Sequence, residues 1–389
     1  MNYKEIEKHH IYKITKPKGE KGRWSTYIKQ PNGKRKYIAK THKDDLYRFL
    51  AQHYNIDLNS KATLNTFFPT WLNHKMIYTN NTETLRRHKQ HYLKYYKDSQ
   101  LANMSLSKIT KLDIEEFIHN SIKEHNLTSK ELNNMLIILK GSLELACEMN
   151  LINSNPYNNI RINRRLCRHV VKKANTKEIY FEDEIKLLYE ALDKELSENP
   201  DCSACLLIKF LFQTGLRISE ATAIKFSDIS DGDIYIRRME TRCSSYNPTD
   251  TSFSKSEFQV VEHTKTKNDA GCRYIPLTPT ALDIIEQARH INETYGYATD
   301  DFIFCTKEGR ITSRQVTYRL KKCCKKANIP FKSPHRIRKT FASTLCNSNL
   351  NIEIIRMILG HTNDTTTYNY IFNPHTDATT RKLFTDALK

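Results

Sequence analysis

Between residues 62 and 158, apolar side chains recur at helical spacing in four successive stretches. The predicted helices are Thr63–Tyr78, Thr82–Tyr96, Lys111–Glu124 and Ser129–Met149. The last of them must stop at Asn153-Ser154-Asn155-Pro156, because proline cannot continue a helix. This pattern predicts a compact, all-helical domain and leaves the residues on either side of it to form different structures.

The residues before this region predict a small sheet. From His10 to Lys40, short polar and apolar alternations are separated by the turn sequences Lys16-Pro17-Lys18-Gly19 and Pro31-Asn32-Gly33. The following stretch, Lys43–Tyr54, has its apolar residues at helical spacing. We therefore predict a three-stranded sheet with one face covered by a helix.

After Glu178, helical and strand patterns mix. The predicted helices are Glu182–Leu196, Cys202–Gln213, Thr280–Tyr295, Ser313–Ala327 and further helix from Pro334 to the end. The predicted strands are Ile234–Arg238, Gln259–Glu262 and Cys272–Ile275. The fold class predicted for the 389 residues is a multidomain, mainly α protein. It has an N-terminal three-stranded β-sheet plus helix, a helical domain and an α+β domain.

Positive charge is concentrated in the first half of the sequence. Lys and Arg number 62 against 43 Asp and Glu, and residues 1–60 alone hold 14 against 6. Residues 61–178 hold 19 against 10, whereas the rest of the chain is nearly balanced. Such an excess attracts a polyanion and releases its counterions on binding, which makes nucleic acid the favoured partner. The alternative is a basic protein without a polyanionic partner.

Other features exclude a membrane or secreted protein. No apolar run reaches the roughly 18 residues of a membrane-spanning helix. The sequence MNYKEIEKHH lacks the apolar core of a secretory signal, so we expect a cytoplasmic protein with its ten cysteines as thiols.

Three groups of side chains are candidates for DNA binding. On the predicted sheet, the open face is expected to carry Arg23, Trp24, Tyr27, Lys29, Lys34 and Lys36. On the helix Thr82–Tyr96 the basic residues are Arg86, Arg87, His88, Lys89, His91 and Lys94. The linker at 159–178 contributes Arg161, Arg164, Arg165, Arg168, Lys172, Lys173 and Lys177. The alternative in each case is an ordinary solvated surface.

Two spacings could indicate metal or redox chemistry. His88 and His91 have no cysteine or acidic partner at ligand spacing, so we expect no metal there. Cys202-Ser-Ala-Cys205 has the CxxC spacing of a redox or zinc site, but there is no second pair, and core packing is favoured. The phosphate-loop, dinucleotide, HExxH and GxSxG motifs are all missing.

Candidate residues for binding and cleaving a phosphodiester are concentrated after residue 210. In Thr214-Gly215-Leu216-Arg217-Ile218-Ser219-Glu220, a glycine ends one helix and an arginine opens the next. In Ser333-Pro334-His335-Arg336-Ile337-Arg338, the serine is a good N-cap and proline suits the first helical position. His335 and Arg338 are three residues apart, so they share one helix face. Gly360 would stop a helix and present His361 at an exposed corner, and Tyr370 follows nine residues later.

In these segments the chain resembles the tyrosine recombinase family, the integrases of temperate phages and conjugative transposons. TGLRISE, SPHRIRKTFA and LGHTNDTTTYNY match the family's three signature blocks in order and spacing. The resemblance implies an arm-type DNA-binding domain at 1–60, a core-binding domain at 61–158, a basic linker at 159–178 and a catalytic domain at 179–389.

The resemblance also implies catalytic roles. Arg217 and Arg338 would clamp the scissile phosphate, since a guanidinium offers two donors in a planar fork. His335 would assist proton transfer, His361 would hydrogen-bond the phosphate, and Tyr370 would attack phosphorus. Lys265 aligns best with the general acid for the leaving 5′ oxygen, with Lys267 as the alternative, and Tyr368 is the alternative to Tyr370. Lys339 departs from many relatives, which carry histidine or aspartate beside the second arginine.

The implied reaction stores the cleaved bond as a 3′-phosphotyrosyl ester and needs neither ATP nor a metal cofactor. Strand exchange implies two duplexes and a homotetramer, with core and arm DNA sites and an excisionase or DNA-bending protein as further partners. An apolar stripe on Thr379–Leu388 would dock on a neighbouring subunit or on its own domain. Two alternatives to a recombinase are a type IB topoisomerase and a DNA-binding regulator without catalysis. His335 and the N-terminal sheet argue against the topoisomerase.

Overall fold

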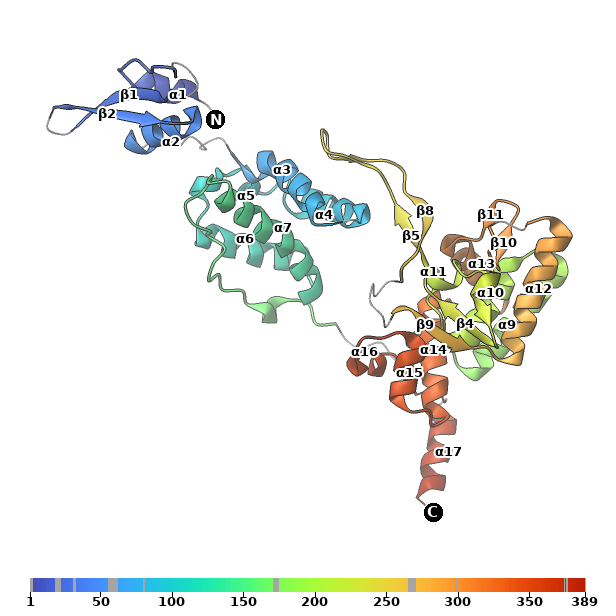
Figure 1. Cartoon of the computed structure of the whole chain (residues 1–389). Helices are drawn as coiled ribbons and strands as arrows, with labels where there is room; N and C mark the ends of the chain where they lie inside the picture. The colour runs from blue at the N-terminus through green and yellow to red at the C-terminus, as the bar shows by residue number, and fades with distance from the viewer. Residues whose placement is uncertain are drawn as a thin grey trace. The chain divides into compact units, whose positions relative to one another are not determined.

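The computed structural model describes residues 3–17, 22–30, 33–54, 62–79, 81–170, 175–264, 271–297, 300–373, 375 and 377–388. Its contacts divide the chain into two compact units (Figure 1). The first contains Met1–Val170 together with Ser244–Lys255, and the second contains Val171–Cys243 and Ser256–Lys389. Buried apolar side chains form separate cores in the N-terminal sheet, in the helical region and in the second unit.

The N-terminal region is a two-stranded antiparallel sheet packed against helices. Strand β1 (Trp24–Lys29) pairs with β2 (Arg35–Lys40), and the helices are α1 (Tyr3–His9) and α2 (Lys43–His53). The third predicted strand is reduced to one bridge, Thr15 to Ser25. The chain reaches Pro17 two residues later, and proline has no N–H with which to extend a ladder. Helix α1 was not predicted from the sequence.

Five helices and a 3-10 turn make up the helical region. They are α3 (Leu64–Ile77), α4 (Thr82–Tyr95), α5 (Gln100–Asn103), η1 (Leu106–Lys108), α6 (Lys111–Glu124) and α7 (Ser129–Glu148). Threonine begins three of them, since the hydroxyls of Thr63, Thr110 and Thr128 accept from backbone N–H groups in capping boxes. Helices α3, α4 and α7 pack around Trp71, which is 3% exposed. The four long predicted helices are confirmed to within a residue or two.

The linker begins as part of this helical region. Ile160, Ile162 and Cys167 pack against its core, and the turn η2 (Arg164–Leu166) contacts α6. The Arg161 N–H donates to the Glu115 carboxylate at 2.6 Å. The described first part of the predicted linker is therefore packed against the helices.

A hairpin from the second half of the sequence also belongs to the first unit. Its strands β6 (Tyr246–Asn247) and β7 (Ser252–Phe253) are antiparallel. The Tyr246 hydroxyl donates to the Asn73 side chain at 2.5 Å, and Asn73 donates to the Pro248 carbonyl at 3.0 Å. The aromatic rings of Tyr246 and Phe253 pack against the helical core. The hairpin is thus docked on α3 and α4.

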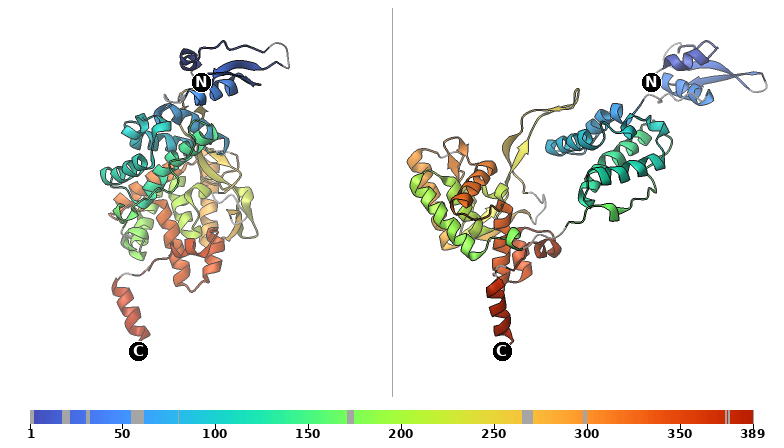
Figure 2. Two further views of the ribbon diagram at one scale, coloured as in Figure 1. Left: turned by 90° about the vertical axis from the view of Figure 1, so that its left-hand side faces the viewer. Right: turned by 180° about the vertical axis from the view of Figure 1, so that it is seen from behind.

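The second unit is built around α10, a buried helix. Its long helices are α9 (Glu182–Glu198), α10 (Ser203–Thr214), α12 (Pro279–Tyr295), α13 (Ser313–Lys326) and α14 (Pro334–Asn347). Helix α10 contacts each of the other four and contributes nine buried residues. Figure 2 shows the helices of this unit from two further sides. Two short helices also belong to this unit. They are α8 (Asn175–Glu178), which precedes α9, and α11 (Ile218–Ala221), which follows α10. All the long helices predicted in this region are confirmed.

Strands in this unit are short. Strands β3 (Ile229–Ser230), β4 (Asp233–Ile236) and β9 (Arg273–Pro276) form an antiparallel sheet in the order β3-β4-β9, preceded by η3 (Phe226–Asp228). Strands β5 (Met239–Cys243) and β8 (Glu257–Val261) form the ribbon whose far end is the docked hairpin. A last pair is β10 (Cys305–Thr306) with β11 (Gly309–Arg310).

Three helices follow α14. They are α15 (Ile352–Leu359), α16 (Asp364–Tyr368) and α17 (Asp377–Ala387). Helix α15 packs on α14, with Ile355 and Leu359 fully buried between them. In α17, by contrast, Phe384 is 67% exposed, so the structure describes no cover for the predicted apolar stripe at that residue. Within the described residues, no helix is long and apolar enough to cross a membrane.

Candidate active site

The site begins where α10 ends. Gly215 closes α10 with a φ of +60°, in the left-handed region that glycine adopts without strain. Two residues later Arg217 is the N-cap of α11, and its guanidinium donates to the Glu220 carboxylate at 2.6 Å and to the Gly360 carbonyl at 3.3 Å. The reversal after α10 therefore places Arg217 beside the end of α15.

Helix α14 supplies the second arginine. Pro334 occupies its first turn after Ser333, and Arg338 lies one turn further on, only 1% exposed. The Arg338 guanidinium donates to the Gly215 carbonyl at 2.9 Å and also to the Leu359 carbonyl. Arg338 thus joins the ends of α10 and α15 from the middle of the unit.

His361 lies directly after α15. Gly360 ends that helix with a φ of +62°, as predicted. The prediction of an exposed corner was wrong, because His361 is only 3% exposed and is held between Arg338 and Thr367. Arg338 Nη2 lies 3.1 Å from Nε2 of His361, and the Thr367 hydroxyl lies 3.0 Å from Nδ1. Because a guanidinium can only donate, we assign Nε2 as the acceptor and place the proton on Nδ1.

Tyr370 follows α16 and faces the same residues. Its ring centroid lies 4.6 Å from that of His361 and 5.1 Å from that of His335, and the Arg338 Cζ is 5.8 Å from the ring. Ser343 of α14 donates to the Tyr370 carbonyl at 3.3 Å. Tyr368, the alternative nucleophile, is 62% exposed.

Five of the six predicted catalytic residues therefore lie together: Arg217, His335, Arg338, His361 and Tyr370. Lys265 and its alternative Lys267 lie outside the described residues.

The buried carboxylate of Glu220 holds Arg217 and Arg338, and the sequence analysis did not single it out. Glu220 is fully buried, and Arg273 of β9 donates to it at 2.9 Å. Burial alone would raise the pKa of Glu220, but the guanidiniums of Arg273, Arg338 and Arg217 lower it to about 2. The ionised carboxylate offsets part of the repulsion among three arginines. Glu220 lies in the quoted TGLRISE segment and Arg273 lies in the predicted strand Cys272–Ile275, but the two residues are 53 positions apart in the sequence.

Burial and positive neighbours also lower the pKa values of Arg338 and His361. Burial, then Arg217, lowers the pKa of Arg338 to about 9, so it remains a cation at neutral pH. Burial, then Arg338, lowers the pKa of His361 to about 3, so the imidazole is neutral. The site therefore combines fixed cations with a neutral histidine.

The lowered pKa of His361 predicts an acid-sensitive second unit. Because the unfolded imidazole has its ordinary pKa near 6.5, protonation favours unfolding, so stability is complete above that value and decreases towards pH 3. Lowering the pH from 6.5 to 5 should decrease the free energy of unfolding by about 1–2 kcal/mol through this group. Hydrogen exchange of α14 amides at both pH values measures it. In His361→Asn the pH dependence should become smaller, and an unchanged dependence would contradict the assigned shift.

Replacing Gly215 should have a second local effect. A Cβ at this position would both occupy the left-handed region and collide with the ring of Phe341. We expect Gly215→Ala to cost at least about 1–2 kcal/mol and to slow DNA cleavage, because the Gly215 carbonyl holds Arg338. Gly232→Ala is the matched control, since Gly232 has a φ of +82° and no atom within 4 Å of an added Cβ. Equal effects of the two variants on cleavage would contradict this role.

The predicted DNA-binding residues of the sheet are only partly on one face. Tyr27 pairs with Tyr37 and Lys29 pairs with Arg35, so these four residues share the open face, with the two tyrosine rings 5.4 Å apart. The prediction that Trp24 lies beside Tyr27 was wrong: Trp24 shares the face of β1 that carries the buried Thr26 and Ile28, and it packs against the core. Alternation along β1 puts residues 24 and 27 on opposite faces.

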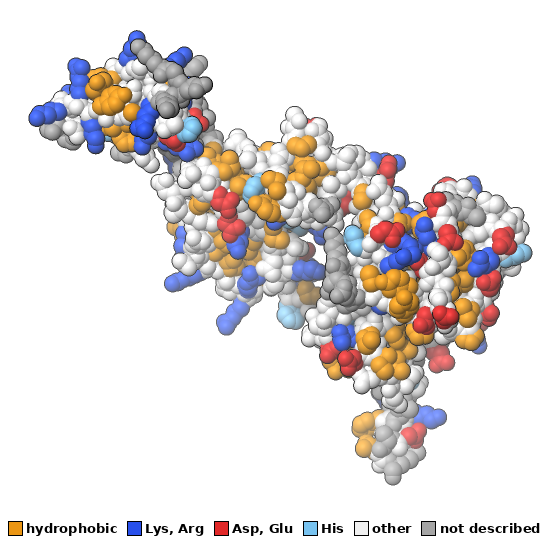
Figure 3. Space-filling view, viewed as in Figure 1, with side chains coloured by type: hydrophobic (Ala, Val, Ile, Leu, Met, Phe, Trp, Pro, Cys, Tyr) orange, Lys and Arg blue, Asp and Glu red, His pale blue; other side chains and the backbone are white. Residues whose placement is uncertain are grey.

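Arg23, Lys29 and Lys34 are exposed, as predicted. Lys36 is also exposed, but the prediction that it shares the open face was wrong, because it pairs with the core-facing Ile28. Sequence reasoning missed Tyr37 and Arg35, which only the register of the hairpin places beside Tyr27 and Lys29. On the face seen in Figure 3, Lys and Arg gather over the N-terminal sheet and mix with Asp and Glu in the second unit.

On α4, two of the predicted DNA-binding residues contact the docked hairpin. Arg86 donates to the Ser254 carbonyl at 2.6 Å, and Lys89 donates to the Thr251 carbonyl at 2.8 Å. Arg87 is exposed. In the linker, Arg161, Arg164 and Arg165 are exposed, and Arg164 donates to Asn133 at 2.9 Å. Arg86 and Lys89, which the sequence analysis assigned to DNA, thus donate hydrogen bonds to the hairpin.

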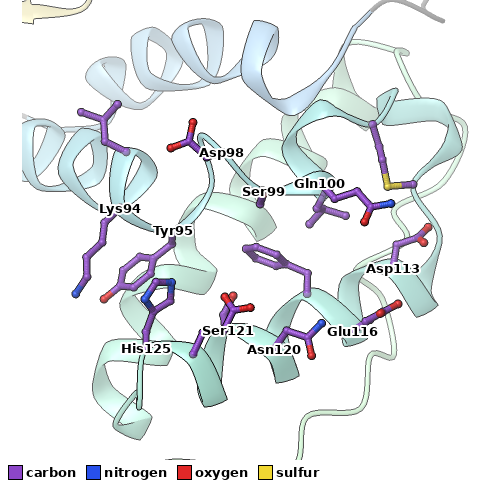
Figure 4. A pocket seen from close by; sticks show the side chains of 15 residues that line it. Lys94, Tyr95, Asp98, Ser99, Gln100, Asp113, Glu116, Asn120, Ser121 and His125 are labelled. Atoms are coloured by element: carbon purple, nitrogen blue, oxygen red, sulfur yellow. The ribbon is translucent and has the colours of Figure 1, made fainter.

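Neither the cavity in the helical region nor the pair His88 and His91 resembles a second active centre. A cavity of about 450 Å³ in the helical region is lined by several carboxylates, including Asp98, Asp113 and Glu116, which disfavour a phosphate (Figure 4). His88 packs edge-on against Trp71, and burial lowers its pKa to about 4. The described residues contain no cluster of three or more histidine, cysteine or acidic side chains suited to a metal ion.

The site and fold agree with what comparison with known proteins shows. Residues 179–375 match the model of the phage integrase family, which covers half of the chain. The chain belongs to this family and is a tyrosine recombinase of the integrase type.

Two similar curated proteins are a tyrosine recombinase and a transposase. The chain is 24% identical over 369 residues to a XerC-like tyrosine recombinase of Caldanaerobacter subterraneus subsp. tengcongensis, covering 92% of this chain and 91% of that protein. It is 28% identical over 305 residues to the transposase of transposon Tn916 from Enterococcus faecalis, covering 75% and 69%.

Two solved structures share the fold. The integrase of transposon Tn1549, solved with transposon right-end DNA, has a TM-score of 0.59 and 19% identity over 84% of this chain and 99% of that chain. The lambda integrase tetramer on a Holliday junction has a TM-score of 0.58 and 16% identity, covering 90% and 93%.

Proposed function

We propose that this recombinase cleaves one strand of its attachment-site DNA with Tyr370, which becomes joined to the 3′ phosphate. A 5′ hydroxyl from the partner duplex then attacks the ester, so one phosphodiester replaces another of nearly equal energy. The observation that carries this proposal is the position of the Tyr370 ring against His335, His361 and Arg338. These groups come from α14 and the segment after α15, and they meet on one side of the unit.

The arginines would bind the non-bridging oxygens of the scissile phosphate. Arg338 Nε is buried and has no hydrogen-bond partner among the described residues, so that N–H is available to an oxygen. Negative charge on these oxygens grows in the transition state, and fixed guanidinium donors stabilise it more than the ground state. Glu220 and Arg273 would hold the pair in place rather than touch DNA.

Proton transfer completes the proposed chemistry. A free tyrosine with a pKa near 10 is about three units from ionisation at neutral pH, a deficit of roughly 4 kcal/mol. His335, in edge contact with Tyr370, would take the phenol proton, and the Arg338 cation would stabilise the phenolate. His361 would hydrogen-bond the phosphate once its proton lies on Nε2, with the Thr367 hydroxyl donating to Nδ1 and Arg338 turned to the phosphate. Lys265 or Lys267 would protonate the leaving 5′ oxygen.

The basic surfaces would position the DNA. We assign residues 1–60 to distal arm sites, residues 61–158 to the core site, 159–178 to the connection and 179–389 to catalysis. Arm binding would use the open face of the sheet, where two tyrosines lie between basic side chains. Exchange of two duplexes requires four active sites, and the lambda relative was solved as a tetramer on a Holliday junction. An excisionase and a DNA-bending protein are further proposed partners.

The test of this function is recombination of a plasmid that carries two attachment sites, incubated with the protein in EDTA without ATP. The proposal predicts deletion or inversion of the DNA between the sites. Relaxed topoisomers without recombinant product would contradict it and would indicate a topoisomerase.

The N-terminal sheet gives a separate prediction. Deleting residues 1–60 removes 14 basic residues and the paired tyrosines, so binding to arm-site duplex should be lost while binding to core-site duplex is retained. Gel-shift titrations of both duplexes at two salt concentrations measure the effect. Unchanged arm-site affinity in the deleted protein would contradict the assignment of this region.

A further inference from the structure

Three cysteines meet at the start of α10. Cys202 is the N-cap residue of this helix, and Cys205 is in its first turn. The Cys205 thiol donates to Cys202 Sγ at 3.5 Å, and the thiol of Cys323 on α13 also interacts with it. Cys205 and Cys323 are fully buried, and Cys202 is 8% exposed. The sequence analysis noted that this CxxC pair has the spacing of a redox or zinc site and favoured core packing.

The geometry of Cys202 and Cys205 suits a disulfide. Residues three apart at a helix start lie about one turn from each other, close to the roughly 5.5 Å Cα separation of disulfides. Their sulfur atoms already face each other at 3.5 Å, so side-chain rotation can close the bond. A bridge within one turn leaves the packing of α10 against its neighbours in place.

The two thiols differ in reactivity. The hydrogen bond from Cys205 and the Arg319 guanidinium both lower the pKa of Cys202, although burial and Glu195 oppose them. The N-terminus of α10 also favours a thiolate at its N-cap. The same hydrogen bond raises the pKa of the Cys205 thiol. Cys202 is therefore the nucleophile, and Cys205 is placed to resolve a mixed disulfide.

The cluster is closest to solvent at the turn before α10. Asn199 and Pro200 in this turn are exposed. Cys202 is thus the member of the cluster nearest to solvent, whereas Cys205 and Cys323 lie behind it.

We propose that Cys202 and Cys205 form a reversible thiol–disulfide site that reacts with low-molecular-weight disulfides. The Cys202 thiolate attacks one sulfur of the small disulfide, whose S–S bond breaks and whose other sulfur leaves as a thiolate that takes up a proton. Cys205 then loses its proton and attacks Cys202 Sγ, forming the protein disulfide and releasing the second small thiol. The protein loses two electrons, and the small disulfide gains them.

The test uses the full-length protein and oxidised glutathione as the probe. After equilibration with equal concentrations of reduced and oxidised glutathione, the protein is denatured, alkylated and digested with trypsin. Residues 195–209 form one tryptic peptide that holds both cysteines, and residues 323–325 form another. We expect more than half of peptide 195–209 to be unalkylated and two hydrogen atoms lighter than the reduced form. Two alkylated thiols in that peptide, or its linkage to 323–325, would overturn the proposal.

Variants test the order of the two steps. In Cys205→Ser the resolving thiol is absent, so one glutathione should accumulate on Cys202, whereas Cys202→Ser should acquire at least tenfold less on Cys205. Cys272→Ser is the matched control, because Cys272 is an exposed thiol outside the cluster, and its loss should leave the bridge unchanged. Equal modification of Cys202 and Cys205 would contradict the assigned roles. The readout needs no DNA, so it is independent of the proposed recombination.

Discussion

Replacing Tyr370 by phenylalanine is expected to abolish covalent attachment to DNA while leaving DNA binding intact. The phenyl ring retains the contacts with His335 and His361, so the surrounding packing should be preserved. The variant loses only the hydroxyl, which is the nucleophile of the proposed reaction. Incubation with a nicked attachment-site duplex, followed by a denaturing gel, detects the adduct, and a gel shift measures binding.

The matched control is Tyr368→Phe. Tyr368 lies two residues earlier, at the end of α16, and is 62% exposed. This variant should form the adduct at the normal rate. An adduct that persists in Tyr370→Phe but disappears in Tyr368→Phe would transfer the role to Tyr368 and contradict the proposed site.

Glu220→Ala should have the largest effect on stability. The carboxylate is fully buried and accepts from Arg217 at 2.6 Å and from Arg273 at 2.9 Å. Removing one partner of a buried ion pair leaves uncompensated charge and costs about 3–5 kcal/mol. Here Arg338 is a third cation at 4.0 Å, so repulsion adds to the loss. Denaturant unfolding of the second unit, followed by hydrogen exchange of α14 amides, measures the change.

Glu220→Gln separates positioning from folding. It keeps the shape of the side chain but removes its charge, so the two arginines proposed to bind the phosphate should shift. Single-turnover cleavage should then decrease by about 100-fold, the effect of losing one fixed donor. The control is Glu240→Gln, a buried carboxylate that accepts from Arg310 at 2.8 Å outside the site. Both variants should lose stability, but only Glu220→Gln should lose cleavage in protein that remains folded. Equal cleavage rates would contradict the positioning role.

Local sequence patterns predicted the helices well. Helix α6 spans Lys111–Glu124 as predicted, because Thr110 caps its start and its apolar residues have strict helical spacing. The grouping of Arg217, His335, Arg338, His361 and Tyr370 was predicted through family resemblance. Nothing local in the sequence brings together segments that are more than 100 residues apart.

Long-range pairing accounts for what was missed. The hairpin β6–β7 has polar residues at its tip, and its stability comes from Asn73, Arg86 and Lys89, more than 150 residues earlier. Likewise, the face of β1 that carries Tyr27 depends on register with Tyr37 rather than on composition. The cysteine cluster required α10 and α13 to be placed side by side before its third member, Cys323, became visible.

The most direct test of the account is to map the covalent bond itself. Wild-type protein is trapped on a nicked duplex that cannot religate, the adduct is digested with protease and nuclease, and the nucleotide-bearing peptide is sequenced by mass spectrometry. The account predicts a 3′-phosphate ester on Tyr370. A nucleotide joined to any other residue, or a bond to the 5′ phosphate, would contradict it.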